Sequence, residues 1–263
     1  SHSDTHLIAV ANVNDAGTGL SLASDGTVAD PEEDDELSVT GTLADEDGVS
    51  GASPTYVWKR AGTAISGATS SSYTLTQSDV GTIISVVISY TDDESESNTI
   101  TLTAASDVDN VNDTPSITST GTTTGTEDAA YSYSITTSDD DSTAGDSWTI
   151  TCTTCPSWLS ISHTAGASTA TLSGTPLDAH VGANSVVIQV ADAAGSTATE
   201  SFTVTVANTN DAPSISSSGT TTGTEDTAYS YSITTSDDDS DSSDSWTITC
   251  TTCPSWLSIS HTA

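Results

Sequence analysis

The sequence predicts an all-β protein made of tandem β-sandwich domains. Apolar and polar residues alternate in short runs, and Gly, Ser, Asp or Pro separates one run from the next, which is typical of strands joined by turns. The runs do not show the 3.6-residue periodicity of an amphipathic helix. An acidic motif also recurs at a fixed interval, which indicates an array of similar domains.

The recurring motif is rich in Asp and Asn and lies between one alternating region and the next. Its three copies are Asn12-Val-Asn-Asp15, Asp107-Val-Asp-Asn-Val-Asn-Asp113 and Asn208-Thr-Asn-Asp211, and their last residues are 98 positions apart. Asp and Asn oxygens, together with the carbonyls of an extended backbone, are the hard ligands that Ca²⁺ prefers. We interpret the motifs as calcium-binding joints. The alternative is that Asn-Asp-x-Pro simply makes a good turn and strand breaker.

The three joints divide the chain into segments. In order, these are 1–14, the closing strand of a preceding domain; 15–112, a β-sandwich; 113–210, a second β-sandwich; and 211–263, the first half of a further repeat. Residues 114–165 and 212–263 agree at 45 of 52 positions, so the last segment repeats the one before it. The chain has no Met and no N-terminal apolar signal segment, and we expect it to be a window of a longer protein.

The first full domain contains several alternating runs. Leu37-Ser-Val-Thr-Gly-Thr-Leu43 alternates, Tyr56-Val-Trp58 offers a Trp suited to a sandwich core, and Ile83-Ile-Ser-Val-Val-Ile-Ser-Tyr90 is the longest apolar strand. A closing strand begins at Thr99-Ile-Thr-Leu102. The acidic turn Asp45-Glu-Asp-Gly48 fits either a calcium turn inside the domain or a solvated loop. Seven or so short strands of this kind predict an Ig-like sandwich.

The second domain has a different sequence of the same length. Its alternating runs are Tyr131-Ser-Tyr-Ser-Ile135, Ser147-Trp-Thr-Ile150, Pro156-Ser-Trp-Leu-Ser-Ile161, Leu172-Ser-Gly-Thr-Pro176, Val186-Val-Ile-Gln-Val-Ala-Asp192 and Phe202-Thr-Val-Thr-Val206. Turn residues separate them, and we predict a second sandwich.

Both domains resemble known repeat families. Tyr56-Val-Trp58, Ser72-Tyr-Thr-Leu75 and Ser78-Asp-Val-Gly81 resemble the bacterial Ig-like repeats of large secreted, calcium-dependent adhesins. Asp79-x-Gly81 resembles the E–F corner of immunoglobulin domains, although the tyrosine and cysteine that usually follow are missing. The second domain resembles dystroglycan-type cadherin repeats and related Ig-like repeats of bacterial surface proteins. The resemblance is carried, in order, by Pro156-Ser-Trp-Leu159, Ser-Gly-Thr-Pro, the Val-Ala-Asp strand and Asn208-Thr-Asn-Asp-Ala-Pro213.

The cadherin-like resemblance implies ligand sets for Ca²⁺ at two joints. The first set is Asp107, Asp109, Asn110, Asn112, Asp113 and Glu127, with Asp139 or Asp141. The second set is Asn208, Asn210, Asp211 and Glu225, with Asp237 or Asp239, and Asp192 from the preceding domain. The competing interpretation is that the acidic triplets are solvated loops.

The four cysteines form two copies of Cys-Thr-Thr-Cys, at Cys152 and Cys155 and at Cys250 and Cys253. Such a motif is a redox site, half of a zinc site or a disulfide. A redox cysteine is favoured at a helix N-terminus, whereas the flanks here predict strand. Zinc needs two further thiols or imidazoles, and none lies at a matching spacing. We therefore favour two disulfides, each closing a short turn.

Composition excludes several classes of function. Two Lys and Arg residues stand against 37 Asp and Glu, giving a formal net charge of −35. Such a surface repels phosphate, which excludes nucleic acid as a partner. No run of 18 apolar residues occurs, so the sequence predicts no membrane span in this window. It carries neither a Gly-x-Ser-x-Gly elbow nor a Gly-rich phosphate loop, and we do not expect an enzyme.

We predict a mechanical role outside the cell or at its surface. Calcium at each joint would lock the interdomain angle, so that the array acts as the rod or fibre building block of a long adhesin or filament protein. Its partners would be neighbouring repeats, other copies in a fibre, and glycans or a host surface contacted through regions outside this window.

The alternative function is a calcium-dependent array of carbohydrate-binding modules. In that case Trp148, Trp158, Trp246 and Trp256 would form a sugar-stacking platform. Because the same Trp positions recur in each copy, a core or edge role is favoured over a platform.

Overall fold

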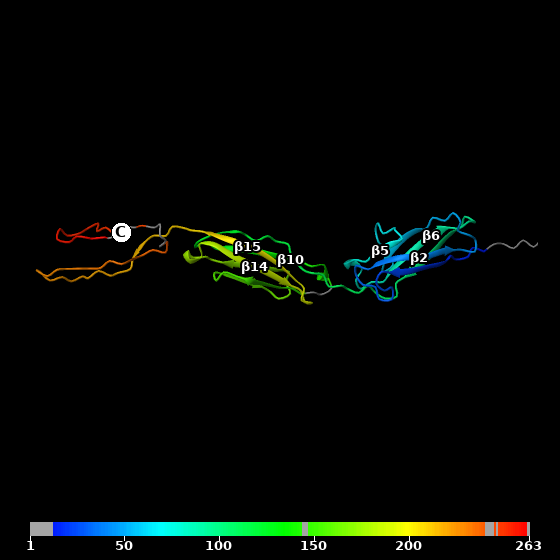
Figure 1. Ribbon diagram of the computed structural model, residues 1–263, viewed down its shortest axis with the longest axis horizontal. Helices are drawn as coiled ribbons and strands as arrows, with labels where there is room; N and C mark the ends of the chain where they lie inside the picture. Colours follow the sequence, from blue (N-terminus) through cyan, green and yellow to red (C-terminus); the bar gives the residue numbers. More distant parts are fainter. Residues whose placement is uncertain (1–12, 144–146, 240–244, 246, 262–263) are drawn as a thin grey trace, which may run out of the picture. The chain divides into compact units, whose positions relative to one another are not determined.

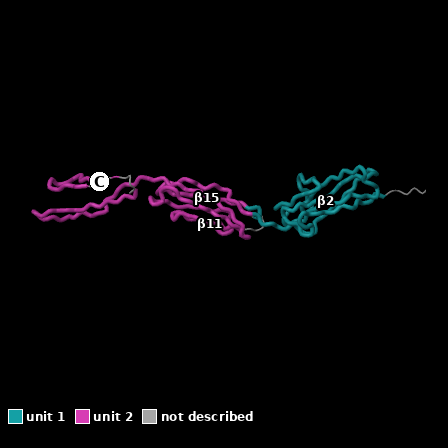
Figure 2. Tube along the Cα trace, in the orientation of Figure 1, with its two compact units in different colours: residues 1–113, 139–146 teal, residues 114–138, 147–263 magenta. Residues whose placement is uncertain are grey.

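The computed structural model describes residues 13–143, 147–239, 245 and 247–261. The predicted strand before Asn12 and the residue Trp246 therefore lie outside the described residues. The structure is all-β, with short 3₁₀ turns between strands (Figure 1). It divides into two compact units, residues 1–113 with 139–146 and residues 114–138 with 147–263 (Figure 2). The acidic turn after residue 138 thus belongs, by its contacts, to the first unit.

The first unit contains two antiparallel sheets with strand orders β1-β2-β5 and β4-β3-β6-β7. Its strands are β1 (Thr18–Ser24), β2 (Glu36–Ala44), β3 (Thr55–Arg60), β4 (Thr63–Ala64), β5 (Ser72–Thr74), β6 (Ile84–Thr91) and β7 (Ser97–Thr103). Alternation decides which side chains fill the core: on β6, Ile84, Val86 and Ile88 are fully buried, whereas the residues between them are half-buried. Trp58 is fully buried, which confirms the predicted core Trp.

A buried ion pair holds the E–F corner of the first unit. Asp79 is fully buried at the end of η1 (Gln77–Asp79) and accepts hydrogen bonds from Arg60 Nε at 2.7 Å and from Tyr73 Oη at 2.8 Å. The backbone N–H of Thr76 donates a third at 2.9 Å. These bonds offset the cost of burying a carboxylate. The tyrosine that usually follows in the E–F corner of immunoglobulin domains is missing here. Tyr73 supplies a phenol hydroxyl to this corner from β5 instead.

The second unit contains two four-stranded sheets with orders β12-β13-β10-β8 and β11-β14-β15-β9, and a two-stranded sheet of β16 and β17. Its strands are β8 (Ser116–Ile117), β9 (Thr124–Thr126), β10 (Tyr131–Ser138), β11 (Thr149–Thr154), β12 (Leu159–His163), β13 (Thr169–Gly174), β14 (Gly182–Ala191), β15 (Thr197–Ala207), β16 (Ser214–Ile215) and β17 (Thr235–Ser236). The core takes alternate residues of the long strands, among them Ile135, Leu172 and Ile188. Both predicted sandwiches are thus built as the alternation indicates.

One parallel pairing recurs in the two sandwiches and positions an acidic residue in each. In the second unit β9 pairs parallel with β15, and Thr126 lies opposite Ala207. In the first unit Glu32 forms an isolated parallel bridge with Asp109. The next residue, Glu33 or Glu127, donates its N–H to the carbonyl of Asp109 or Ala207, each at 2.9 Å. Both glutamates are thereby placed beside the linker that follows their own sandwich.

The disulfides, and two of the four tryptophans of the alternative sugar platform, behave as predicted; Trp256 is 70% exposed. Cys152 is bonded to Cys155, and Cys250 to Cys253. Trp158 packs edge-on against Tyr131 with ring centroids 5.5 Å apart, and its Nε1 donates to Asn184 Oδ1 at 3.1 Å. Trp148 is also packed against the core. Trp158 and Trp148 therefore have a core or edge role.

Candidate metal centre

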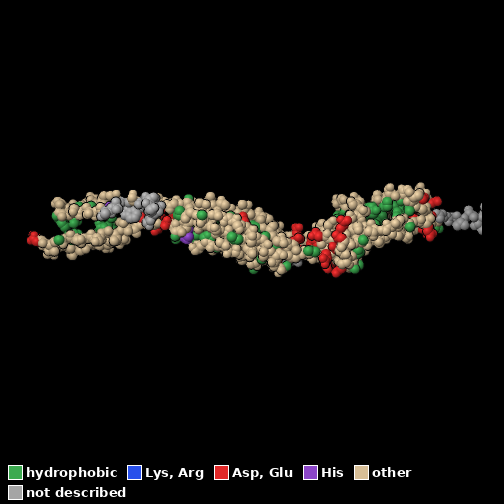
Figure 3. Space-filling view, in the orientation of Figure 1, with side chains coloured by type: hydrophobic (Ala, Val, Ile, Leu, Met, Phe, Trp, Pro, Cys, Tyr) green, Lys and Arg blue, Asp and Glu red, His purple; other side chains and the backbone are tan. Residues whose placement is uncertain are grey.

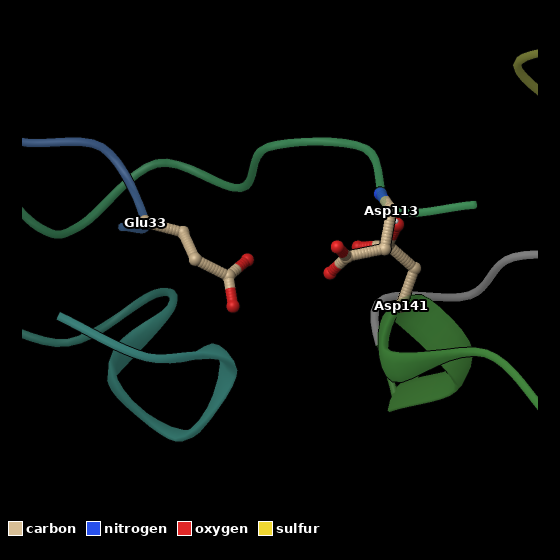
Figure 4. Close-up of side chains that lie close together, drawn as sticks. All are labelled: Glu33, Asp113 and Asp141. Atoms are coloured by element: carbon tan, nitrogen blue, oxygen red, sulfur yellow. Dashed lines mark hydrogen bonds between the residues drawn. The ribbon is translucent and has the colours of Figure 1, made fainter. Parts of the chain in front are cut away.

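Three carboxylates converge in the first unit. Glu33, Asp113 and Asp141 each offer an oxygen, and these oxygens all lie within 4.8 Å of one another. Figure 4 shows Glu33 pointing across a gap toward Asp113 and Asp141. Glu33 comes from the segment before β2, Asp113 ends the linker, and Asp141 lies in the 3₁₀ turn η2 (Asp140–Thr143). On the face drawn in Figure 3, acidic side chains gather at the ends of this unit.

Backbone and amide donors hold the acidic turn on the linker. Asp141 Oδ2 accepts the N–H of Asp113 at 2.6 Å, and its Oδ1 accepts Nδ2 of Asn110 at 2.6 Å. Within the turn, Asp141 donates its own N–H to Asp139 Oδ1 at 3.3 Å. Asp141 is only 3% exposed, so its charge lies close to the other carboxylates with little screening by water.

The electrostatics of this cluster favour a cation. Glu33 is 6% exposed, and its Oε2 has no hydrogen-bond partner among the described residues. Burial raises the pKa of Glu33, and the charges of Asp113, Asp34 and Asp141 raise it further, against a backbone hydrogen bond from Val111 that lowers it. Burial, followed by Asp141, likewise raises the pKa of Asp113. A buried carboxylate with an unsatisfied oxygen and like-charged neighbours fits a bound divalent cation.

A second cluster in the other unit shares two of the three positions, with Glu127 in place of Glu33 and Asp239 in place of Asp141. Glu127, Asp178 and Asp239 offer carboxylate oxygens within the same 4.8 Å limit. Thr209 donates its N–H to Glu127 Oε2 at 3.2 Å, which anchors the glutamate to the next linker. Asp178 opens the 3₁₀ turn η3 (Asp178–His180), and Asp239 follows β17. Burial and then the charge of Asp128 raise the pKa of the nearby Asp211.

The two clusters share their hydrogen bonds as well as their residue types. Asn208 Nδ2 donates to Asp239 Oδ1 at 3.0 Å, as Asn110 does to Asp141, and the N–H of Asp211 donates to Asp239 Oδ2, as that of Asp113 does to Asp141. A third copy of the last bond joins the N–H of Asp15 to Asp47 Oδ2 at 3.2 Å. The linkers therefore have one local design, in which the last Asp binds the acidic turn that follows.

Several predicted ligands lie in the linkers without joining the carboxylate clusters. Asp107 and Asp109 are exposed. Asn112 Nδ2 donates to the carbonyl of Asp113, and Asn210 Nδ2 to that of Asp211, both at 2.7 Å. These two amides thus make hydrogen bonds within their own linkers.

In the acidic turns, two further predicted residues act as local acceptors. Asp139 and Asp237 accept the N–H of the residue two positions later. They shape the turns that present Asp141 and Asp239.

The structure corrects the placement of three predicted ligands. Glu127 belongs to the second cluster and not the first, because β9 places it beside Ala207, at the end of its sandwich that meets the following linker. Asp192 lies at the opposite end of the β14–β15 hairpin from Asn208, where it accepts the N–H groups of Gly195 and Ser196 at 2.6 and 2.7 Å. Glu225 is exposed and outside the second cluster.

The sequence reasoning missed Glu33, Gln77 and Asp178. Glu33 lies in the acid-rich run 30–36, in which no residue stands out by type. The sequence signal for Glu33 is the correspondence of Glu32-Glu-Asp34 with Thr126-Glu-Asp128. The structure agrees with this correspondence, because Asp34 and Asp128 both adopt positive φ, 68° and 57°. Asp178 was overlooked because its turn carries one acid among neutral residues.

Comparison with known proteins identifies the domain type. Residues 114–207 and 212–263 match the family He_PIG, described as "Putative Ig domain". No curated protein matches the sequence. No helix among the described residues is long and apolar enough to cross a membrane.

Solved structures of several kinds are similar to the chain at low scores. An endo-fucoidan hydrolase of glycoside hydrolase family 107 is 25% identical at a TM-score of 0.33, over 64% of this chain and 25% of that one. The protocadherin GammaB4 extracellular domain is 18% identical at 0.38, over 80% and 35%. The SrpA adhesin of Streptococcus sanguinis is 17% identical at 0.32, over 40% and 65%. The chain spans 25% and 39% of the two hydrolase structures matched.

Proposed function

Because this chain belongs to the He_PIG family of Ig domains, we propose that it is a structural repeat region of a long extracellular adhesin or filament protein, stiffened by calcium. The proposed role is mechanical and not catalytic. The observation that carries it is the buried Glu33, which has an unsatisfied Oε2 and clusters with two further carboxylates; a second trio of carboxylates gathers around Glu127.

The chemistry of the donors supports Ca²⁺ in particular. The two clusters consist of carboxylates, whose oxygens are hard ligands, and Ca²⁺ takes six to eight oxygen ligands from carboxylates, carbonyls and waters. Glu33, Asp113 and Asp141 would hold the ion of the first cluster, and Glu127, Asp178 and Asp239 that of the second. When bound, the ion supplies the positive charge that offsets the mutual repulsion of these groups.

Fixing the acidic turn has a mechanical consequence in this proposal. Asp141 already bonds to the linker through Asp113 and Asn110, and β10 runs directly into its turn. A cation held by Glu33 and Asp141 would tie the acidic turn more strongly to the first unit. The resulting array would project a distal region or assemble with other copies, and contacts with glycans or a cell surface would lie in other parts of the protein.

Calcium titration of the whole chain tests the proposal. We expect saturable Ca²⁺ binding by calorimetry, and small-angle scattering curves that change between calcium and chelator. Glu33→Gln should abolish binding at the first cluster, whereas Glu32→Gln, an exposed neighbour, should leave it intact. Asp141→Asn and the exposed Asp140→Asn form a second matched pair. Absence of saturable binding, or identical scattering in both conditions, would refute the proposal.

A further inference from the structure

The two clusters differ at two equivalent positions. Asp113 joins the first cluster whereas its counterpart Asp211 does not join the second, and the first residue of a 3₁₀ turn also differs. Gln77 opens η1 and Asp178 opens η3. Each turn is followed by Val and then by a Gly with positive φ, Gly81 at 71° and Gly182 at 98°. Each also lies just before the first strand of the sandwich's last hairpin, β6 or β14. The same turn therefore presents a neutral amide to one cluster and a carboxylate to the other.

The side chain of Gln77 is tied to the first cluster by its amino group. Nε2 donates to Asn110 Oδ1 at 3.1 Å and lies 3.5 Å from Asp141 Oδ1. Its carbonyl oxygen Oε1 is buried and has no hydrogen-bond partner among the described residues. A buried acceptor without a donor is costly, and it calls for a partner such as an ion. Gln77, through Nε2, and Glu33, as a member of the cluster, both lie close to Asp141, and each carries one oxygen without a hydrogen-bond partner among the described residues.

We propose that Gln77 contributes Oε1 to the cation of the first cluster, in the place where Asp178 contributes a carboxylate to the second. The first residue of the turn then sets the affinity of each cluster, because cation affinity follows the number of charged ligands. At this position the first cluster has the neutral amide of Gln77, whereas the second has the negative carboxylate of Asp178. This inference rests on the proposed cation binding and adds the residue that tunes it.

Isosteric variants of Gln77 test the proposal in a chain whose second cluster is silenced by Glu127→Gln. Gln77→Glu keeps the length and adds a charge, and it should tighten Ca²⁺ binding about tenfold, whereas Gln77→Met, which removes the oxygen, should weaken it by about the same factor. Ser78→Glu adds the same charge at the exposed next position and should bind as the parent does. Asp178→Asn, made in a Glu33→Gln chain, should weaken the second cluster.

The outcomes separate this inference from the proposed function. If the unaltered chain binds no Ca²⁺ saturably, cation binding itself is refuted. If the chain binds but Gln77→Met matches the parent, or Ser78→Glu tightens binding as much as Gln77→Glu, the affinity-setting role of Gln77 is wrong. Retention of the parent's Trp fluorescence spectrum, to which the buried Trp58 contributes, checks in each variant that the fold is kept.

Discussion

Residues 114–165 and 212–263 have nearly the same sequence but are organised differently. In the first copy Tyr131 and Leu159 are 5% and 7% exposed within a closed core. Their counterparts Tyr229 and Leu257 are only half-buried, and Trp256 is 70% exposed where Trp158 is packed. A cavity of about 710 Å³ lies beside Tyr229 and Trp256.

The difference follows from the partners of each strand. In the second sandwich β10 is paired with β13 along six residues, and β14 and β15 complete the other sheet. Among the described residues after 211, only the two-residue pair of β16 and β17 forms, at the positions equivalent to β8 and the end of β10. Alternation alone therefore does not make a strand: a neighbour must satisfy its backbone and cover its apolar face.

Removing a core side chain from β13, a strand that the last repeat lacks among its described residues, should have the largest effect on the stability of the second sandwich. Leu172 on β13 is fully buried, and Leu172→Ala should destabilise the second sandwich by about 2–5 kcal/mol through the cavity it leaves. Urea denaturation followed by Trp fluorescence measures the change. Leu177→Ala, at a residue 56% exposed, is the control and should cost less than about 0.5 kcal/mol. Equal effects would show that β13 does not complete the core.

The equivalent tyrosines Tyr133 and Tyr231 differ by one hydrogen bond, and the contribution of that bond to stability can be measured. Tyr133 Oη bonds Ser119 Oγ at 2.7 Å, as the equivalent Tyr231 bonds Ser217, but Tyr133 Oη also donates to Glu200 Oε2 at 2.6 Å. Tyr133→Phe should cost about 1.5–3 kcal/mol because the bond to a charged group is lost. Tyr231→Phe should change the same denaturation curve by less than about 0.5 kcal/mol. A comparable loss in both would mean that Glu200 adds nothing.

The two disulfides provide a smaller contrast. Each closes a loop of about four residues, for which chain entropy predicts at most about 2 kcal/mol. Cys152→Ser with Cys155→Ser should lower the denaturation midpoint of the second sandwich. The same change at Cys250 and Cys253 should leave that midpoint unchanged. If the first pair of substitutions also has no effect, that disulfide does not stabilise the fold.

Alkaline titration of the tyrosines tests the closed core with the smallest expected effect, because the stability at neutral pH does not change. Burial, reinforced by Glu200, raises the pKa of Tyr131 and of Tyr133 to about 12. Because the folded pKa exceeds the unfolded value of about 10, this stabilisation is complete below pH 10 and is lost as the pH rises to 12. Ultraviolet absorbance should show late-ionising tyrosines, one fewer in Tyr133→Phe. Ionisation of every tyrosine near pH 10 would contradict the closed core.

The strands and the disulfides could be predicted because their signals are local. Alternation in Ile83–Tyr90 is visible without any partner, and Cys-Thr-Thr-Cys brings its thiols together within one turn. The repeated linkers likewise identified Asp113 and Asp211, together with the acidic turns that bind them.

The full clusters could not be predicted because they depend on contacts between distant segments. Glu33 is selected from an acid-rich run by the parallel bridge between Glu32 and Asp109. Asp192 was misplaced because only the β14–β15 register reveals which end of the hairpin it occupies. Gln77 carries no charge and so gave no signal at all.

The parallel pairing of β9 with β15 also determines how the second sandwich responds to force. The chain enters β9 at one end of this pair and leaves β15 at the other. Tension applied across the ends of this pair therefore loads its strands in shear, and the hydrogen bonds of Thr124–Thr126 are stretched together. An antiparallel hairpin pulled from its open end would instead break one bond at a time. The sandwich thus resists pulling in shear, and its lifetime under tension depends on the rate of unfolding.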